Sequence, residues 1–289
     1  SYSRDMAHAI RTVGIVGSGI MGSGLAEVIA RAGYDVVVAS RSWATADAVL
    51  QTIDGALAKA VERGKATADV HQQTMRRITA AEGLVALADC DLVIESVVEE
   101  LDVKVALFGE LDRVTKPAAI LATNTSTLPV IDLALATSRP EQVCGIHFFN
   151  PAPLMKLVEV VRPLTACAET IDTSMAFVAS CGKDGVEVKD HAGFIVNALL
   201  FPYLNNAVRM LERGTASIES IDTAMKGGCN FPMGPFALLD LVGIDTSVAI
   251  LETIHDSFGN PSDEPAATLR EMITAGHLGR KTKHGFYTY

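Results

Sequence analysis

Short apolar runs alternate with longer amphipathic stretches through the first two thirds of the chain. The runs that we expect to be strands are Thr12–Val16, Asp35–Ala39, Asp91–Glu95, Ala119–Ala122, Val143–Phe148, Leu157–Val161 and Glu187–Lys189. The stretches that we expect to be helices are one that ends at Ala32, then Ala44–Arg63 and Leu101–Val114. Buried strands alternating with amphipathic helices predict an α/β fold with a doubly wound parallel sheet.

The pattern changes near residue 190, because no convincing strand follows Lys189. Helical periodicity is seen instead over Phe194–Arg213, Ser217–Lys226, Gly243–Phe258 and Ala267–Ala275. We therefore place a boundary at about residues 188–192, with an α/β domain over 1–190 and a smaller all-helical domain over 191–289.

Composition and charge narrow the class of protein. The chain has 289 residues, 49% of them hydrophobic and 20% charged, which suits an ordered globular protein with enough core for two domains. Its formal net charge is −10 and it has no Lys/Arg-rich run, which argues against nucleic acid or an anionic membrane surface as a partner.

The five cysteines and the N-terminal segment indicate an intracellular protein without a metal. The cysteines are scattered, with no Cys-x-x-Cys pair, so we expect buried reduced thiols and neither a disulfide framework nor a zinc site. The apolar runs are only strand-length and no signal peptide precedes Thr12, so a cytoplasmic location is expected, with Ser1–Arg11 a polar extension.

A glycine-rich turn between the first strand and the first helix predicts a dinucleotide site. Gly17, Gly19 and Gly22 would allow the tight turn, the approach of the pyrophosphate and the packing of helix on strand, respectively. Ile20 and Met21 complete the loop at the helix N-terminus, which would face the phosphate charge. The alternative is a glycine-rich turn without a ligand.

The end of the second strand bears on the choice of cofactor. An Asp or Glu is usual there and binds the ribose hydroxyls of NAD, but this chain has Ser40 and Arg41. A hydroxyl and a guanidinium suit a 2′-phosphate, so this pair favours NADP(H) over NAD(H). Alternatively, Arg41 is an ordinary surface residue.

A histidine and a glutamate flank a proline-rich turn. His147 ends one apolar run, Glu159 lies within the next, and a reversal near Pro153 would bring the two side chains together. A carboxylate on one imidazole nitrogen fixes the tautomer and leaves the other nitrogen to move a proton. The alternative is a core histidine bonded to backbone.

Three further polar residues are candidates for ligand contact. Ser126 follows a strand at the edge where ligands bind, although it could instead cap a helix. Asn197 lies on an apolar helix, where a buried amide needs a partner, either substrate or backbone. Lys104 could contact the cofactor or form a solvated pair with Glu100. For Lys59, Arg63 and Lys65, a solvated helix face is favoured over phosphate binding.

Taken together, the motifs resemble the 3-hydroxyacyl-CoA dehydrogenase family, and within it the short single-function type, from Val13 to Tyr289. The motifs that carry the resemblance are Gly17-Ser-Gly-Ile-Met-Gly22, Glu95-Ser-Val-Val-Glu99 with Lys104, Thr123-Asn-Thr-Ser126, His147-Phe-Phe-Asn-Pro151, Phe194-Ile-Val-Asn197, Pro232-Met-Gly-Pro235 and Gly285-Phe-Tyr287.

The resemblance implies a Rossmann domain, a helical dimerisation and substrate domain, and oxidation of an (S)-3-hydroxyacyl-CoA to the 3-ketoacyl-CoA with NAD(P). By the same resemblance, His147 is the catalytic base or acid and Glu159 its partner. Ser126 and Asn197 match the polar groups around the reacting substrate oxygen, and Glu99 and Lys104 match cofactor-side positions. Ser40 departs from the family pattern, which puts the usual NAD preference in doubt.

Three alternatives stay open at this point. The same chemistry could act on a hydroxyacyl group carried by acyl carrier protein. A 3-hydroxyisobutyrate-type enzyme would use a lysine one turn before the interdomain asparagine, where this chain has Gly193. A relative that binds nucleotide without turnover is the non-enzymatic reading.

Overall fold

The computed structural model describes residues 10–289, and its residue contacts divide the chain into two compact units. The first ends at Asp190 and the second runs from His191 to Tyr289. The polar extension predicted at Ser1–Arg11 lies almost wholly outside the described residues. Each unit has its own hydrophobic core, so each is described by itself.

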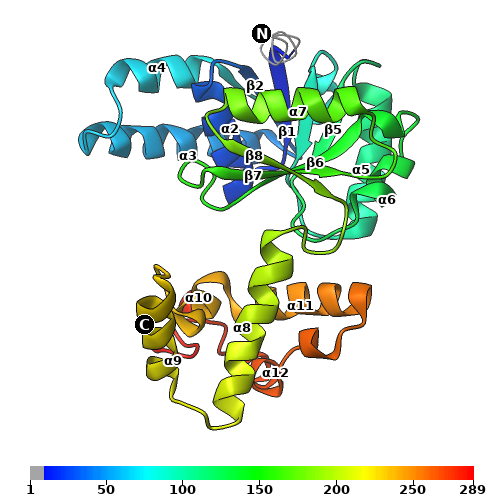
Figure 1. The fold of residues 1–289 in the computed structure, drawn as a ribbon. Coiled ribbons are helices and arrows are strands. Elements are labelled where there is room, and N and C mark those ends of the chain that lie inside the picture. Colours follow the sequence, from blue (N-terminus) through cyan, green and yellow to red (C-terminus); the bar gives the residue numbers. More distant parts are fainter. Residues whose placement is uncertain (1–9) are drawn as a thin grey trace. The chain divides into compact units, whose positions relative to one another are not determined.

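The first unit is built on one eight-stranded sheet, drawn in Figure 1. Its order is β3-β2-β1-β4-β5-β6-β7-β8. The strands are β1 (Thr12–Val16), β2 (Asp35–Ser40), β3 (Ile78–Glu82), β4 (Leu92–Glu95), β5 (Ile120–Thr123), β6 (Val143–Phe148), β7 (Leu157–Arg162) and β8 (Asp184–Lys189). All neighbouring pairs are parallel except β6 and β7. The sheet is therefore mostly parallel, with one antiparallel step where a short turn joins β6 to β7.

Helices cover both faces of this sheet, which confirms the doubly wound α/β fold. They are α2 (Ile20–Arg31), α3 (Trp43–Glu62), α4 (Ala68–Arg76), α5 (Leu101–Val114), α6 (Val130–Leu135) and α7 (Ala168–Ser180). Side chains of α2, α3 and α7 share one continuous core with the sheet, whereas α5 packs with α6 outside that core. Strand β4, which follows β3 in the chain, lies next to β1, so the ends of β1 and β4 form the switch point where such folds bind ligands.

Several elements of this unit were not predicted. Strand β3 contains only one large apolar residue, Ile78, and α4 is predominantly polar, so neither stands out in the sequence as an apolar run. β3 forms because it hydrogen-bonds to the edge of the sheet along β2. Pairing with a strand that is already in place outweighs weak local propensity.

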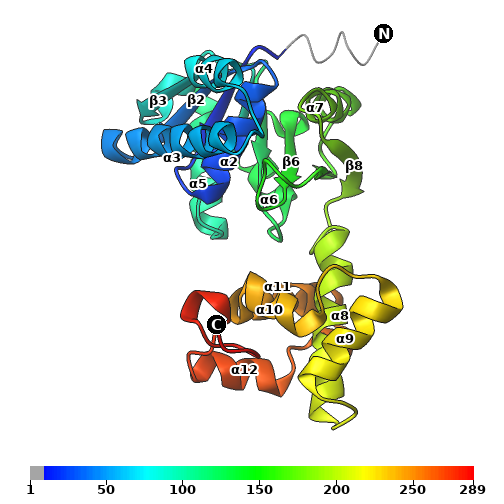
Figure 2. The same cartoon turned by 90° about the vertical axis from the view of Figure 1, so that its left-hand side faces the viewer.

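The second unit is all-helical within the described residues, as predicted. It contains α8 (Val196–Glu212), α9 (Ile218–Cys229), α10 (Pro235–Val242), α11 (Ile244–Phe258) and α12 (Ala267–Thr274), labelled in Figure 2. Helix α8 begins two residues later than the apolar pattern indicates, because Gly193 and Phe194 have φ of 76° and 50°. Such backbone is left-handed and cannot belong to the helix. Helix α10, which was not predicted, begins with Pro235 in its first turn.

Two buried carboxylates hold the C-terminal segment onto this unit. Asp240 accepts hydrogen bonds from the backbone N–H groups of Phe286 (2.8 Å) and Tyr287 (2.9 Å). Asp222 likewise accepts from Phe236 (2.8 Å), and the Tyr287 hydroxyl donates to it. These bonds give a structural role to the Pro232–Pro235 and Gly285–Tyr287 motifs.

Gly285 offers a test of this arrangement. A Cβ atom at Gly285 would lie 2.0 Å from Asp240 Oδ1. We expect Gly285→Ala to lower the free energy of unfolding by about 1–3 kcal/mol, because the carboxylate must move away from the groups it binds. Urea denaturation followed by circular dichroism measures the change. Gly227→Ala is the matched control, since no described atom lies within 4 Å of that Cβ position; equal losses in both variants would contradict the role of Asp240.

Among the described residues, no helix is both long enough and apolar enough to cross a membrane.

Candidate active site

The turn between β1 and α2 has the shape that a dinucleotide pyrophosphate requires. Gly17 has φ of 128°, and a Cβ there would lie 2.3 Å from the Ser96 carbonyl oxygen; a Cβ on Gly22 would lie 2.2 Å from the Gly17 oxygen. Only glycine fits at these two positions. At Gly19, by contrast, no described atom lies within 4 Å of a Cβ, so the space beside its backbone is open.

The N-terminus of α2 presents positive charge to this open space. Gly19 is the N-cap, and among the described residues no side chain caps the helix and no acid lies in its first turn. The first N–H groups of α2 are therefore available to a phosphate. Ile20 is 80% exposed beside them, whereas Met21 packs against the core. The loop thus fits the nucleotide site predicted for it.

The end of β2, where sheets of this kind bind the adenosine of a dinucleotide, has an acid beside it that the chain order does not reveal. Ser40 ends β2, and its hydroxyl is hydrogen-bonded to that of Thr45; Arg41 is exposed. Glu82 ends β3 directly beside Ser40, and its carboxylate accepts a hydrogen bond from the Trp43 backbone N–H (3.2 Å). The neighbouring strand therefore supplies a carboxylate where β2 has none.

A buried ion-pair network lies at the carboxyl ends of β4 and β5. The Lys104 ammonium, on a side chain 1% exposed, binds Glu95 Oε1 at 2.7 Å and Glu99 Oε2 at 3.0 Å. Glu95 is fully buried at the end of β4 and also accepts from the Thr123 hydroxyl at 2.7 Å. Lys104 is thus inside the protein and not in a solvated pair with Glu100, so any effect of Lys104 on a cofactor would pass through its carboxylate partners.

Glu99 connects this network to Ser126. Glu99 Oε1 accepts a hydrogen bond from the Ser126 backbone N–H (2.9 Å) and from the Thr125 hydroxyl. Burial raises the pKa of the Glu99 carboxyl, but the Lys104 charge and these hydrogen bonds outweigh it and hold the pKa below its usual range. Ser126 is therefore placed by an ionised carboxylate, and it does not cap α6, whose N-cap is Pro129.

His147 and Glu159 face each other across the antiparallel β6–β7 pair. The two residues are direct partners in the register, and His147 Nδ1 is 2.8 Å from Glu159 Oε2. Their exposed fractions are 3% and 1%, so the pair is shielded from bulk water. The predicted reversal near Pro153 is present and brings the side chains together. With the Glu159 carboxylate accepting from Nδ1–H, this hydrogen bond fixes the tautomer and the orientation of the imidazole.

Three contacts fix the loop that follows His147. Asn124 Oδ1 accepts from the Phe148 backbone N–H (2.8 Å), which ties the end of β6 to the segment after β5. Lys183 donates from Nζ to the carbonyl oxygens of Ala152 (2.6 Å) and Met155 (2.8 Å). The turn between β6 and β7 is thus anchored at both ends, which orients the imidazole.

Asn197 belongs to the helical unit. It lies in the first turn of α8 and is 8% exposed. Gly193, four residues earlier, has a left-handed backbone, and a Cβ there would lie 2.9 Å from the Ala198 nitrogen. The position where a 3-hydroxyisobutyrate-type enzyme would have its lysine is therefore held by a glycine that the local backbone requires.

Glu82, Glu95, Asn124 and Lys183 were not among the predicted site residues. Glu95 and Asn124 lie within two of the sequence motifs, Glu95–Glu99 and Thr123–Ser126, and Glu95 also ends the apolar run Leu-Val-Ile-Glu. Glu82 and Lys183 act on segments that are distant in the sequence, so local pattern could not identify them.

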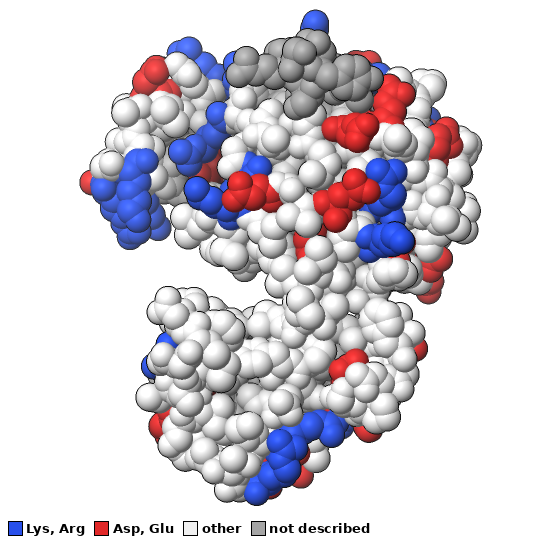
Figure 3. Space-filling view, viewed as in Figure 1, with Lys and Arg blue, Asp and Glu red and all other residues white. Residues whose placement is uncertain are grey.

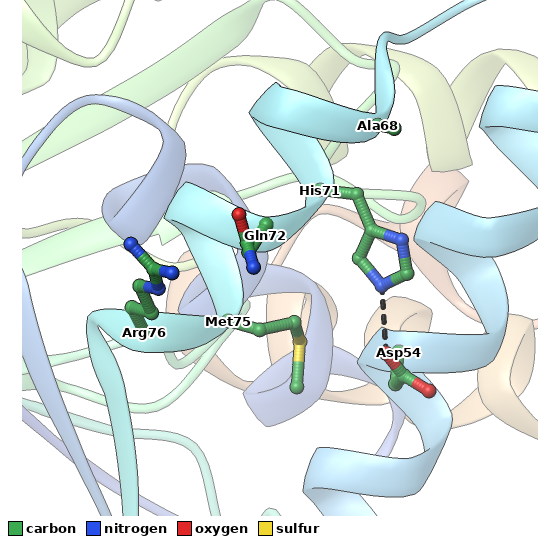
Figure 4. A pocket seen from close by; sticks show the side chains of 6 residues that line it. All are labelled: Asp54, Ala68, His71, Gln72, Met75 and Arg76. Carbon is green, nitrogen blue, oxygen red and sulfur yellow. Dashed lines mark hydrogen bonds and ion pairs between the residues drawn. The ribbon is translucent and has the colours of Figure 1, made fainter.

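The remaining surface candidates lie apart from these residues. A depression between α3 and α4 is lined by Asp54, Ala68, His71, Gln72, Met75 and Arg76, and none of the predicted site residues belongs to it (Figure 4). Figure 3 shows basic side chains gathered near the end of α3, where Lys59, Arg63 and Lys65 are exposed. Within residues 10–289, no three His, Cys, Asp or Glu side chains are grouped as a metal site would require.

Comparisons with known proteins agree with this geometry. Residues 12–191 match the family model of the 3-hydroxyacyl-CoA dehydrogenase NAD-binding domain, and residues 193–289 match that of the C-terminal domain. The chain is 44% identical over 284 residues to a 3-hydroxybutyryl-CoA dehydrogenase of Bradyrhizobium diazoefficiens, and the aligned region covers 98% of this chain and 97% of the relative. It is 40% identical over 290 residues to the mitochondrial hydroxyacyl-coenzyme A dehydrogenase of Homo sapiens, with coverages of 97% and 91%.

A solved structure is similarly close. The (S)-3-hydroxybutyryl-CoA dehydrogenase of Ralstonia eutropha superposes with a TM-score of 0.95 at 40% identity, over 97% of this chain and 99% of that chain. The matched NAD-binding domain, together with the open glycine turn, identifies the first unit as one that binds NAD(H). With both of its domains matched in order over nearly the whole chain, this protein belongs to the 3-hydroxyacyl-CoA dehydrogenase family and is an oxidoreductase.

Proposed function

We propose that this protein interconverts an (S)-3-hydroxyacyl-CoA, of which 3-hydroxybutyryl-CoA is the first candidate, and the corresponding 3-ketoacyl-CoA. The observation that carries the proposal is the buried His147–Glu159 pair, 2.8 Å apart, at the carboxyl end of β6 in a sheet whose β1 leads into an open glycine turn. Relatives named 3-hydroxybutyryl-CoA dehydrogenase match along nearly the whole chain and support the substrate class.

His147 performs the proton transfer. In the reducing direction Nε2 donates a proton to the C3 oxygen as that oxygen becomes a hydroxyl, and in the oxidising direction it removes the hydroxyl proton. Glu159 holds the imidazole in the tautomer that exposes this nitrogen to substrate and stabilises the imidazolium. When bound, the nicotinamide supplies or accepts the C3 hydride.

Ser126 and Asn197 are proposed to bind the substrate. The backbone of Ser126 is held by Glu99, so its hydroxyl is presented from a fixed loop at the strand edge. Asn197 carries an amide that can donate to a substrate oxygen. Glu99 is proposed as a cofactor-side residue, with Lys104 acting through it.

The test of this function is the reduction of acetoacetyl-CoA, followed through the absorbance of the reduced nicotinamide, which is lost as hydride is transferred. We expect turnover, with loss of absorbance proportional to enzyme. Acetoacetyl-acyl carrier protein is tested in the same reduction assay, and free 3-hydroxyisobutyrate is tested in the oxidising direction with the oxidised nicotinamide. Turnover of the carrier-protein substrate alone would show that the enzyme acts on acyl groups bound to acyl carrier protein. Nucleotide binding without any turnover would contradict an enzymatic role.

The cofactor choice has two opposing signals. The sequence at Ser40–Arg41 favours NADP(H), whereas the family model that matches the first unit is that of an NAD-binding domain. Glu82, which pairs with Ser40 in the strand register, adds an acidic group at this end of the site.

We also propose that the protein is a homodimer through its helical unit. Leu199, Leu241 and Phe258 are large apolar residues of this unit that are at least half exposed in the single chain. Light scattering on the purified protein measures the mass directly.

A further inference from the structure

We propose that Glu82 reads the adenosine ribose from the neighbouring strand and disfavours a 2′-phosphate, so that NAD(H) is bound in preference to NADP(H). The inference rests on the nucleotide site of the proposed function. It assigns to β3 the acidic group that comparable sheets place at the end of β2.

The strand register places Glu82 at the adenosine end of the site. The Gly17 N–H donates to the Ala39 carbonyl oxygen (3.2 Å), so the glycine turn lies beside the end of β2. Ser40 pairs with Glu82 in the parallel β2–β3 register, and the Gly83 N–H donates to the Ser40 carbonyl oxygen (2.9 Å). Neighbouring strands are about 5 Å apart, so Glu82 is one strand spacing from the usual acidic position.

The Glu82 carboxylate is held where a 2′-phosphate would need to be neutralised. Its Oε2 accepts from the Trp43 backbone N–H at 3.2 Å, in the first turn of α3. A helix N-terminus is the natural place for an anion, and here a protein carboxylate already uses it. A ribose hydroxyl can donate to this carboxylate, whereas a phosphate dianion cannot and is repelled.

The groups that would favour a phosphate are weaker in this arrangement. The hydroxyls of Ser40 and Ser42 are both hydrogen-bonded to the hydroxyl of Thr45, which satisfies them within the start of α3. Arg41 and Glu82 are both exposed, so water screens both charges, and what sets Glu82 apart is the hydrogen bond that its carboxylate accepts from the Trp43 backbone N–H. The carboxylate is the group fixed by a hydrogen bond to backbone, and it decides the preference.

The experiment measures binding without substrate. Dissociation constants of NADH and NADPH are obtained from nicotinamide fluorescence at one fixed ionic strength, for the wild type and for Glu82→Gln. We expect the wild type to bind NADH at least tenfold more tightly. Glu82→Gln, which keeps an oxygen for the Trp43 N–H, is expected to tighten NADPH about tenfold and to change NADH by less than threefold.

Two further variants separate charge from structure. Glu62→Gln removes the same charge at the other end of α3 and is expected to leave the ratio of the two dissociation constants unchanged. Glu82→Asp keeps the charge and is expected to retain the NADH preference. Competition by 5′-ADP and 2′,5′-ADP should show the same selectivity, since these fragments differ only in the 2′-phosphate.

An unchanged ratio of the NADH and NADPH dissociation constants in Glu82→Gln would overturn the proposal. Tighter binding of NADPH than of NADH by the wild type would also overturn it and would indicate that Arg41 determines the preference. Both outcomes are distinct from failure of the proposed function. If the protein does not reduce acetoacetyl-CoA but still binds NADH more tightly than NADPH, the proposed substrate is wrong and the proposed role of Glu82 is unaffected.

Discussion

His147→Gln is expected to lower kcat for acetoacetyl-CoA reduction by about 10²–10⁴-fold, the range that general acid–base groups contribute. Glutamine approximates the length of the imidazole but cannot donate and recover a proton near neutral pH. The fold should survive, because His147 is on a strand held by β5 and β7, and the Asn124 bond to the Phe148 N–H does not involve the imidazole. NADH binding should change by less than about threefold, which separates catalysis from binding.

The chain offers a matched control for this variant. His71 Nε2 is 2.6 Å from Asp54 Oδ1, so it is a second histidine–carboxylate pair, bridging α4 and α3 away from β6 (Figure 4). His71→Gln is expected to leave kcat within about twofold of wild type, since that pair touches none of the proposed catalytic residues. Glu159→Gln should fall between the two, because the imidazole remains but its orientation is no longer fixed. Wild-type turnover in His147→Gln would remove the role of this residue.

Lys104→Met is expected to cost about 3–5 kcal/mol of unfolding free energy, the largest stability effect that we predict. The substitution leaves Glu95 fully buried without its cation, although the Val97 N–H and the Thr123 hydroxyl still donate to it. It also takes from Glu99 the charge that holds its pKa low, which loosens the contact with Ser126. Urea denaturation measures the loss, and a higher KM would report the loosened loop.

Two controls separate burial from charge. Lys116 forms an ion pair with Asp91, and its side chain is 39% exposed. Lys116→Met should therefore lower the free energy of unfolding by only about 0–1 kcal/mol. The double variant Glu95→Met with Lys104→Met should recover part of the loss, since replacing both members of a buried pair costs less than removing one. A loss below about 1 kcal/mol in Lys104→Met would show that the network does not hold this edge of the sheet.

Parts of the site that depend on nearby residues were predictable. The glycine turn lies within six residues of the chain, and the steric reasons for Gly17 and Gly22 are local. The His147–Glu159 pair needs only one reversal at a proline-rich turn, so alternation and turn chemistry were enough to place it. The two-unit organisation was visible because the strand signal ends near residue 190.

Other parts depended on which strands become neighbours. The sequence shows that Ser40 replaces an acid, and from this it favours NADP(H). Only the pairing of β2 with β3 brings Glu82 beside Ser40, across 42 residues of chain, and offers a reason for the opposite preference. The sequence left Lys104 open between a cofactor contact and a solvated pair with Glu100, and the packing of α5 places its ammonium between Glu95 and Glu99 instead.

The sequence by itself determined the class of fold, the family and the residues that can exchange a proton or approach a phosphate. The fold class and the candidate residues follow from periodicity, turn chemistry and spacing within short segments, where few conformations are open to the chain, and the family follows from the resemblance of the motifs. Tertiary structure alone decided which charges are buried together and which carboxylate lies beside Ser40 at the end of β2. The physical reason is that strand order and helix packing bring distant residues to within hydrogen-bond distance, where burial and charge determine what each group does.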